Sequence, residues 1–359
     1  MKRMDVKMVA VSNSIGLIIA GVTGISLAIY GYGAWAIVWQ SITLTSVKTF
    51  VLWTSERWMP TLTFSFSALK SYFGIGSRMM LTSFFNTLFL NIYSFFIGNR
   101  AGLSSLGYYT QSDRWSKMGI TSISQVFTSS FLPALSAVQD DNERYLRACS
   151  RMNRLAAYIL FPSMLWLIVM APNIFHTLFD NKWDNSIALF QLLLARGIFT
   201  ILIGIYNNFL LAKNHPKAIL WIEILRDGVA FIVLIATLPF INESRGDNPV
   251  WGLELLIFGQ LLSSFVAWVV TLIITTRFIK ASARKFISDL FPYFFLSLAI
   301  CGVLYVISNL FQQAILNLAF QIIIAFTLYF VINFLSGSKI QREAIAYIMK
   351  KPLPSEIQS

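Results

Sequence analysis

Charged residues and cysteine are scarce in this chain, and each shortage excludes a class of protein. Lysine, arginine, aspartate and glutamate together make up only 12% of the 359 residues, whereas apolar residues make up 56%. Soluble domains of this length carry a much more polar surface, so a soluble fold is not expected. The chain has only two cysteines, Cys149 and Cys301. They fall in segments that are not expected to meet, so no disulfide framework is predicted.

Long apolar runs take the place of the missing charges. A helix needs about 20 apolar residues to cross a bilayer. Lipid offers no hydrogen bonds to the backbone, so only helices and closed barrels, which pair all their backbone groups internally, can span it. We therefore predict an all-α integral membrane protein with about ten transmembrane helices. The predicted spans are Val9–Tyr30, Ala34–Trp53, Ile75–Gly98, Met118–Val138, Leu155–Ala171, Ile187–Leu211, Ala218–Phe240, Val250–Thr275, Leu290–Leu310 and Ala314–Leu335.

Lysine and arginine are distributed unequally between the links that join these spans. Most of the 28 basic residues fall in the two termini and in every second link, while the opposite links hold only Arg100, Arg114, Lys117, Lys182 and Arg245. By the positive-inside rule both termini are predicted to be cytoplasmic, which requires an even number of spans. The net charge of +12 is scattered over short links on one face. It predicts contact with anionic membrane lipids and no nucleic-acid binding.

Polar residues inside the spans form stripes with helical spacing. On the third, fourth and sixth spans they lie on one side of an otherwise apolar helix, which indicates a shared, water-accessible cavity. The residues of the three stripes are Arg78, Thr82, Asn86 and Tyr93; Thr121, Gln125, Thr128, Ser129 and Ser136; and Arg196, Thr200 and Asn207.

Each stripe also has a structural interpretation, which the sequence leaves open. Serine, threonine and asparagine join helices in membranes, and Arg78 lies near enough to the cytoplasmic end of its helix to reach the interface. Arg196 lies near the middle of its span, where a cation is costly, so it is either a cavity-facing cation or half of an ion pair. Glu223, Arg226 and Asp227 are predicted to neutralise one another. Glu254 is either interfacial or a site of ion coupling.

Enzymatic chemistry finds few candidate residues. The only histidines, His176 and His215, are predicted to lie on opposite sides of the membrane, so they cannot share a metal ion. No P-loop is present, and the Asp140-Asp141 pair is interpreted as the start of a helix. We therefore expect no catalytic residues, no metal site and no cofactor.

Several short motifs follow one another in a distinctive order. They are Leu106-Gly107-Tyr108-Tyr109, Ser112-Asp113-Arg114, Phe131-Leu132-Pro133-Ala134-Leu135-Ser136, Gln139 to Arg144, and Leu178-Phe179-Asp180-Asn181-Lys182-Trp183. In this order and spacing the chain resembles the Wzx-type polysaccharide-biosynthesis flippases, which belong to the larger group that includes multidrug and lipid II exporters. The resemblance covers most of the chain and is strongest from about Phe64 to Asp227.

The resemblance implies transport of a polyprenyl-diphosphate-linked oligosaccharide from the cytoplasmic to the outer leaflet of the bacterial inner membrane. No covalent step is needed. The partners would be the lipid-linked oligosaccharide, membrane lipids and other polysaccharide assembly proteins. Arginine pairs with phosphate oxygens, and side-chain amides or hydroxyls form hydrogen bonds with the hydroxyl groups of sugars. The expected substrate-binding residues are Arg196, Arg78, Asn86, Gln125, Thr200 and Asn207.

Relative to the resembled family, the first span matches the fifth helix, so about four helices of the first lobe are expected to be missing. Either the chain is truncated, which is the preferred interpretation, or a partner supplies the remainder. Residues 1–61 would hold the last two helices of the N-terminal lobe, residues 62–275 a complete six-helix C-terminal lobe, and residues 276–359 two additional helices and a tail. Two rival functions stay open. A cation-coupled multidrug exporter would carry buried acidic residues, and a membrane polysaccharide polymerase or ligase would carry a large outer loop.

Overall fold

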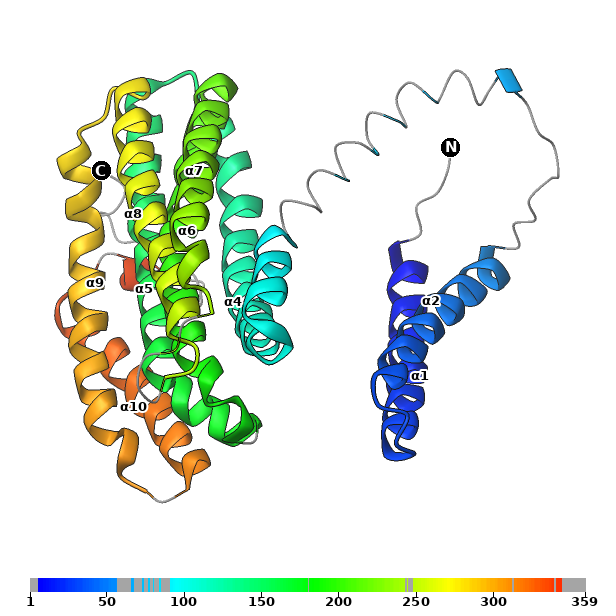
Figure 1. Ribbon diagram of the computed structural model, residues 1–359. Coiled ribbons are helices and arrows are strands. Elements are labelled where there is room, and N and C mark those ends of the chain that lie inside the picture. The colour runs from blue at the N-terminus through cyan, green and yellow to red at the C-terminus, as the bar shows by residue number, and fades with distance from the viewer. Residues whose placement is uncertain are drawn as a thin grey trace. The chain divides into compact units, whose positions relative to one another are not determined.

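The computed structural model describes residues 6–56, 66–67, 73, 77, 80, 84, 91–179, 181–242, 244, 248–311, 313–338 and 340–343. Every regular element over five residues long in this part is an α-helix, which confirms the predicted all-α class. The chain divides into two compact units, Met1–Phe84 and Phe85–Ser359 (Figure 1). The predicted lobe boundaries at residues 61 and 275 stay predictions.

The first unit contains a helical hairpin. Helices α1 (Val6–Ile29) and α2 (Ala34–Glu56) are joined by a turn in which Gly31 and Gly33 have φ angles of 81° and 53°, a conformation that favours glycine. The two helices approach closely where Gly24 of α1 faces Gln40 of α2. Their outer surfaces expose large apolar side chains, as expected for helices in lipid.

The second unit is a helical bundle. Its helices are α4 (Gly102–Ser136), α5 (Asn142–Leu178), α6 (Asn185–Ala212), α7 (Pro216–Thr237), α8 (Trp251–Phe278), α9 (Ala283–Val306) and α10 (Ala314–Leu335), and residues 91–100 are also helical. Among the described residues, six helices are long and apolar enough to cross a membrane: α1, α5, α6, α8, α9 and α10. The chain is a multi-pass membrane protein.

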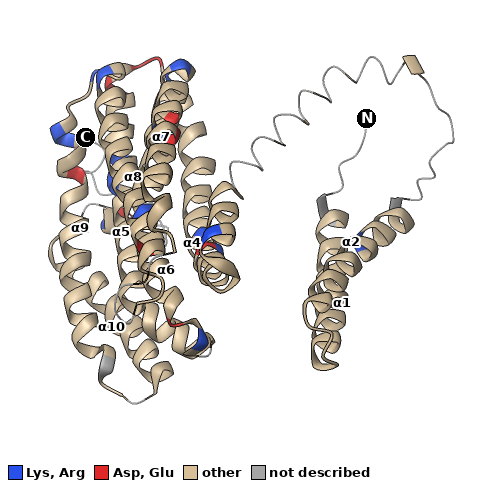
Figure 2. Ribbon diagram, viewed as in Figure 1, with Lys and Arg blue, Asp and Glu red and all other residues tan. Residues whose placement is uncertain are grey.

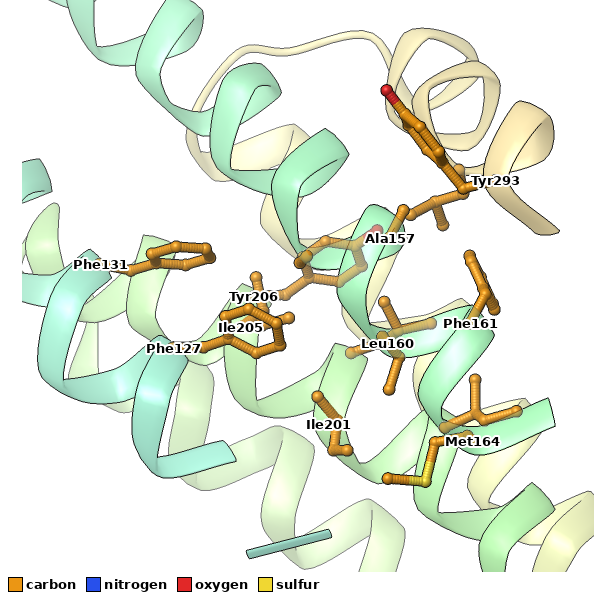
Figure 3. Close-up of a cluster of buried hydrophobic side chains, with 14 of the residues drawn as sticks. Phe127, Phe131, Ala157, Leu160, Phe161, Met164, Ile201, Ile205, Tyr206 and Tyr293 are labelled. Atoms are coloured by element: carbon orange, nitrogen blue, oxygen red, sulfur yellow. The ribbon is translucent and has the colours of Figure 1, made fainter. Parts of the chain in front are cut away.

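The core of the bundle lies where α4, α5 and α6 meet. Phe127 of α4 packs here with Leu160 and Met164 of α5 and with Ile205 and Tyr206 of α6 (Figure 3). These side chains are almost completely inaccessible. Each helix contributes one apolar face to this cluster. Helix α6 contacts α4, α5 and α8 and is therefore surrounded by other helices.

Helices α9 and α10 pack against α5 rather than standing apart from the bundle. Tyr158 of α5 forms ring contacts with Tyr293 of α9 at 5.6 Å and with Tyr329 of α10 at 5.2 Å. The Tyr329 hydroxyl donates to the Tyr158 carbonyl at 2.8 Å. Nearer the C-terminal end of α5, Asn173 donates to Gln321 of α10 at 3.0 Å. The C-terminal helix pair is therefore anchored by polar contacts at two levels.

Two predicted spans are parts of longer helices. The span expected at Met118–Val138 corresponds to the second half of α4, which begins at Gly102 and ends at Ser136, so most of the outer link expected before Lys117 is helical. The span expected at Leu155–Ala171 is the middle of α5, a single helix of 37 residues that also contains the basic segment before it. Hydropathy finds only the part of a helix that lies in lipid, whereas the helix continues wherever its backbone remains paired.

Basic residues gather at one end of the bundle, where α8 ends and α9 begins, and are sparse along the helices (Figure 2). Arg277 and Arg284 lie at this end, in the link predicted to be cytoplasmic. Arg277 and Arg284, which the orientation prediction assigns to the cytoplasmic side, thus lie together at this end of the bundle.

Candidate functional site

Arg196 is the central residue of the candidate site, on the middle of α6. Its side chain is partly exposed, and Nη1 donates to Oε1 of Gln260 on α8. Gln260 itself is only 3% exposed. Among the described residues Arg196 has no carboxylate within ion-pair distance. Its positive charge is therefore hydrogen-bonded but not neutralised by this part of the chain.

Close packing with α4 positions this part of α6. Gly197, next to Arg196, lies so near Ile120 of α4 that an added Cβ would overlap with the isoleucine side chain. The hydroxyl of Thr200 donates to the Arg196 carbonyl at 3.2 Å, and Thr200 is exposed. The glycine therefore allows α4 to approach α6 beside Arg196.

Asn207 lies on the same side of α6 as Arg196 but forms a separate polar group. Its amide donates to Oε1 of Glu223 on α7 at 3.1 Å. Glu223 forms an ion pair with Arg226, which also contacts Asp227 at 3.0 Å. The predicted mutual neutralisation on α7 is confirmed. Eleven residues of helix, about 16 Å, separate Arg196 from Asn207, so the two do not form one compact site.

The polar stripe on α4 faces away from the packed side of that helix. Gln125, Thr121, Thr128, Ser129 and Ser136 are all exposed. The packed side is instead lined by buried residues, including Ser112 and Ser116. In the described part of the bundle the stripe therefore does not serve as a helix-to-helix contact, and Gln125 is free to meet a ligand.

Two of the predicted binding residues, Arg78 and Asn86, lie outside the described residues, as does Thr82. Tyr93, the last member of that predicted stripe, is described. Its hydroxyl donates to the Ala230 carbonyl of α7 at 3.4 Å. The expected role of Arg78 and Asn86 stays a prediction.

Glu254, considered above as interfacial or as an ion-coupling residue, lies in the first turn of α8. Its Oε2 accepts from the Asn248 amide at 2.8 Å, and the Asn248 side-chain oxygen accepts from the Val250 backbone amide at 3.0 Å. An acidic residue in the first helical turn interacts favourably with the helix dipole. This arrangement fits the interfacial interpretation.

A buried polar cluster between α5 and α9 was not predicted. Asp289 of α9 is 9% exposed and accepts from Ser150 at 2.6 Å and from Arg154 at 3.2 Å, both on α5. Asn153 donates to the Phe286 carbonyl at 2.9 Å and accepts from Tyr206 of α6 at 3.3 Å. Ser150, Asn153 and Arg154 have the i, i+3 and i+4 spacing that places them on one face of α5, and this spacing is the signal in the sequence that points to the cluster.

Comparisons with known proteins identify the family. The model of the family described as polysaccharide biosynthesis protein matches residues 1–188, slightly over half of the chain. The succinoglycan biosynthesis transport protein ExoT of Rhizobium meliloti is 24% identical over 292 residues, 80% of this chain and 57% of that protein. The teichuronic acid biosynthesis protein TuaB of Bacillus subtilis is 23% identical over 182 residues, 50% of this chain and 38% of that protein.

Among solved structures, the lipid II flippase MurJ in an inward closed conformation is similar in fold. The TM-score is 0.61 with 14% sequence identity, and the match covers 90% of this chain and 69% of that one. At this identity the likeness concerns the fold alone. The chain spans 38% and 57% of the lengths of TuaB and ExoT, so it matches only part of each relative. From its sequence match and its all-helical membrane fold, the chain belongs to the polysaccharide biosynthesis protein family.

Proposed function

We propose that this protein transports a polyprenyl-diphosphate-linked oligosaccharide from the cytoplasmic to the outer leaflet of the bacterial inner membrane, for surface polysaccharide biosynthesis. Three findings support the proposal: the family match, a relative named as a biosynthesis transport protein, and a fold shared with a lipid II flippase. Transport of this kind makes and breaks no covalent bond. The proposal accordingly assigns no catalytic residue, metal or cofactor.

The uncompensated charge of Arg196 is the observation that carries the proposal. A cation in the middle of a membrane helix costs about 2.5–3.5 kcal/mol on insertion scales. Such a cost is expected to be balanced by a partner, and the described residues supply only the neutral amide of Gln260. A diphosphate would neutralise this charge, because the planar guanidinium can donate hydrogen bonds to two phosphate oxygens at once.

The remaining candidate residues would meet the glycan. Gln125 of α4 and Thr200 of α6 are exposed, and their amide and hydroxyl groups can exchange hydrogen bonds with sugars. The amide nitrogen of Asn207 is already bound to Glu223 and would donate to a sugar only after exchanging that partner. Arg78 and Asn86 complete the proposed set.

The proposed mechanism is alternating access between two lobes, as in transporters built from repeats. Residues 1–61 would belong to the first lobe, residues 62–275 would form the second, and residues 276–359 would add the helix pair α9–α10 and a tail. Both termini would be cytoplasmic. The polyprenyl chain would remain in lipid while the charged headgroup crosses between the lobes.

Replacing Arg196 tests this function. In cells that carry the protein, Arg196→Ala is expected to reduce surface polysaccharide at least about tenfold and to trap the lipid-linked precursor in the inner leaflet, since one charge-assisted hydrogen bond contributes about 1.5–3 kcal/mol. Arg196→Lys should restore export in part. Arg284→Ala, at an exposed basic position of α9, is the matched control.

The readouts separate the proposed function from its rivals. Unchanged export by Arg196→Ala at normal protein level would remove this residue from the mechanism. Precursor that reaches the outer leaflet but is not joined into polymer would indicate a polymerase or ligase. Export that depends on Glu254 and on a cation gradient, with no effect on polysaccharide, would indicate a drug exporter.

A further inference from the structure

An apolar groove lies between α4 and α5, at the end of the bundle where α5 ends. Its volume is about 260 Å³, and none of its lining residues belongs to the candidate site described above. Phe175 and Phe190 form the floor and are 2% and 5% exposed. Met118 and Leu178 form the rim and are 63% and 59% exposed. The groove is thus closed below and open towards the surroundings of the bundle.

The lining offers nothing to a polar ligand. Besides the indole of Trp115, its one polar side chain is Ser122, whose hydroxyl donates to the Met118 carbonyl of its own helix at 2.8 Å. Water gains no hydrogen bonds in an apolar cavity, so such a cavity stays dry. A flexible alkyl chain can pack against these apolar side chains, and the lipids of a bilayer supply such chains.

Two basic residues lie close in the sequence to aromatic residues that line the groove. Arg114 precedes Trp115, whose ring contacts Phe179 with centroids 5.6 Å apart, and Lys182 follows three residues after Phe179. Both basic side chains are exposed, and neither forms an ion pair with a described residue. Lys117, in contrast, is neutralised by Asp113 at 2.6 Å. Two cations without an ion-pair partner among the described residues therefore lie within three residues of aromatic residues that line the groove.

The aromatic residues at this end fit the level of the lipid headgroups. Trp115 lies on the rim, and Trp183 packs edge to face on Tyr108 with centroids 6.2 Å apart. Tryptophan and tyrosine are enriched where hydrocarbon meets the headgroups. Rings at the headgroup level would place the groove in the hydrocarbon and the two cations in the phosphate layer.

We propose that this groove binds an anionic phospholipid of the outer leaflet, with one acyl chain against Phe175 and Phe190 and the headgroup phosphate beside Arg114 and Lys182. Charge complementarity selects an anionic lipid over a zwitterionic one, and the apolar lining holds its chain. The bound lipid would fill the space between α4 and α5 and so hold α4 against the bundle. The inference stands whether or not the protein transports an oligosaccharide.

Filling the groove is the first test. The full chain is placed in nanodiscs of phosphatidylcholine with a minor fraction of phosphatidylglycerol that carries a photoreactive diazirine on its acyl chain. Crosslinked peptides are then identified by mass spectrometry. An added Cβ at Gly119 meets no atom within 4 Å, so leucine can enter the groove without disturbing the helix. Gly119→Leu is expected to lower crosslinking to α4 and α5 about tenfold, equivalent to excluding roughly two methylenes.

A matched control accompanies this variant. Gly302 of α9 is exposed and also has no atom within 4 Å of an added Cβ. Gly302→Leu should leave crosslinking at the groove unchanged. Both variants must give the same elution profile and thermal midpoint as the wild type, which keeps a loss of crosslinking separate from a loss of folding.

Removing the cations tests the headgroup contact. Each basic residue near a charged membrane surface contributes about 1 kcal/mol, so Arg114→Gln and Lys182→Gln should each reduce the preference for phosphatidylglycerol over phosphatidylcholine about fivefold. Lys217→Gln, exposed at the start of α7, is the control and should change nothing.

Three results would overturn the proposal. One is phosphatidylglycerol crosslinking at α4 and α5 that Gly119→Leu does not reduce. Another is equal occupancy by the two phospholipids, which would leave Arg114 and Lys182 without a role. The third is selective crosslinking of a photoreactive polyprenyl diphosphate in place of phosphatidylglycerol, which would make the groove a site for the carrier lipid.

Discussion

Asp289 shows how one residue can join two helices of the bundle. Its carboxylate accepts from Ser150 and Arg154 of α5, and the Arg154 side chain is 36% exposed. We expect Asp289→Ala to lower the free energy of unfolding by about 1–3 kcal/mol, because it leaves a hydroxyl and a partly screened guanidinium without their acceptor. The measurement is the thermal midpoint in detergent.

Two further variants sharpen this prediction. Ser288→Ala, at the exposed neighbouring position, should keep the wild-type midpoint. The double variant Asp289→Leu with Arg154→Met should be more stable than Asp289→Ala, because an apolar pair leaves no charge unpaired. If Asp289→Ala matches the wild type, the carboxylate does not hold α9 to α5.

Asp141 caps the start of α5 and makes the stability of the folded protein depend on pH. Its carboxylate accepts from the backbone amides of Arg144 and Glu143, each at 3.1 Å. The Arg144 amide is the largest cause that holds the pKa of Asp141 below its ordinary value of 3.8. Because the folded-state pKa is the lower one, the stabilisation is present above pH 3.8 and is lost as the pH falls through the folded-state pKa.

The corresponding measurement compares Asp141→Ala with the wild type across pH. The thermal midpoint of the variant should be lower than that of the wild type near neutral pH. The difference between the two midpoints should narrow in acid, because the wild-type carboxylate becomes protonated. Asp140→Ala is the control, since no amide among the described residues donates to Asp140. Equal midpoints at neutral pH would show that the cap contributes nothing.

Part of the candidate site could be predicted at this scale. The helical spacing of Arg196, Thr200 and Asn207 correctly placed them on one side of α6. It could not show that Arg196 meets Gln260 of α8 while Asn207 meets Glu223 of α7. A periodic pattern defines a face, and which neighbouring helix covers that face depends on the packing of all the helices together.

At the scale of elements, Gly252 marks a place where backbones touch. It lies at the start of α8, where an added Cβ would overlap with the Phe240 carbonyl and approach the Ile241 carbonyl oxygen at 2.8 Å. Backbone cannot move aside as a side-chain tip can. We expect Gly252→Ala to lower the free energy of unfolding by about 1–3 kcal/mol, as measured by thermal denaturation in detergent.

The same substitution at an open position provides the contrast. Gly302 of α9 has no atom within 4 Å of an added Cβ. Alanine favours helix over glycine by up to about 1 kcal/mol, so Gly302→Ala should be neutral or stabilising. A Gly252→Ala variant as stable as Gly302→Ala would show that the ends of α7 and α8 can separate at little cost.

At the scale of the whole molecule, the predicted orientation can be tested by labelling single cysteines. The native Cys149 and Cys301 are buried and would be replaced by serine or alanine. Arg147 has a side chain that is 61% exposed, and Lys182 is also exposed. A membrane-impermeant maleimide is expected to label Lys182→Cys in intact cells and Arg147→Cys only after permeabilisation, because the basic links should face the cytoplasm.

Labelling with the opposite pattern would invert the orientation and the direction of transport proposed above. Labelling of both positions in intact cells would show that α5 does not cross the membrane, although its length and composition allow it to. A cysteine in place of Lys285, which is exposed in the first turn of α9, provides an independent check on the cytoplasmic side.

The sequence by itself determined that this chain is helical and embedded in lipid. Apolar runs long enough to span a bilayer can pair their backbone groups only within the helix itself, so this property is local and readable. The tertiary structure decided what the polar residues do. Asp289 bridges to α5, Glu223 to α6 and Gln260 to Arg196, because such contacts join residues far apart in the chain and depend on how closely neighbouring helices approach.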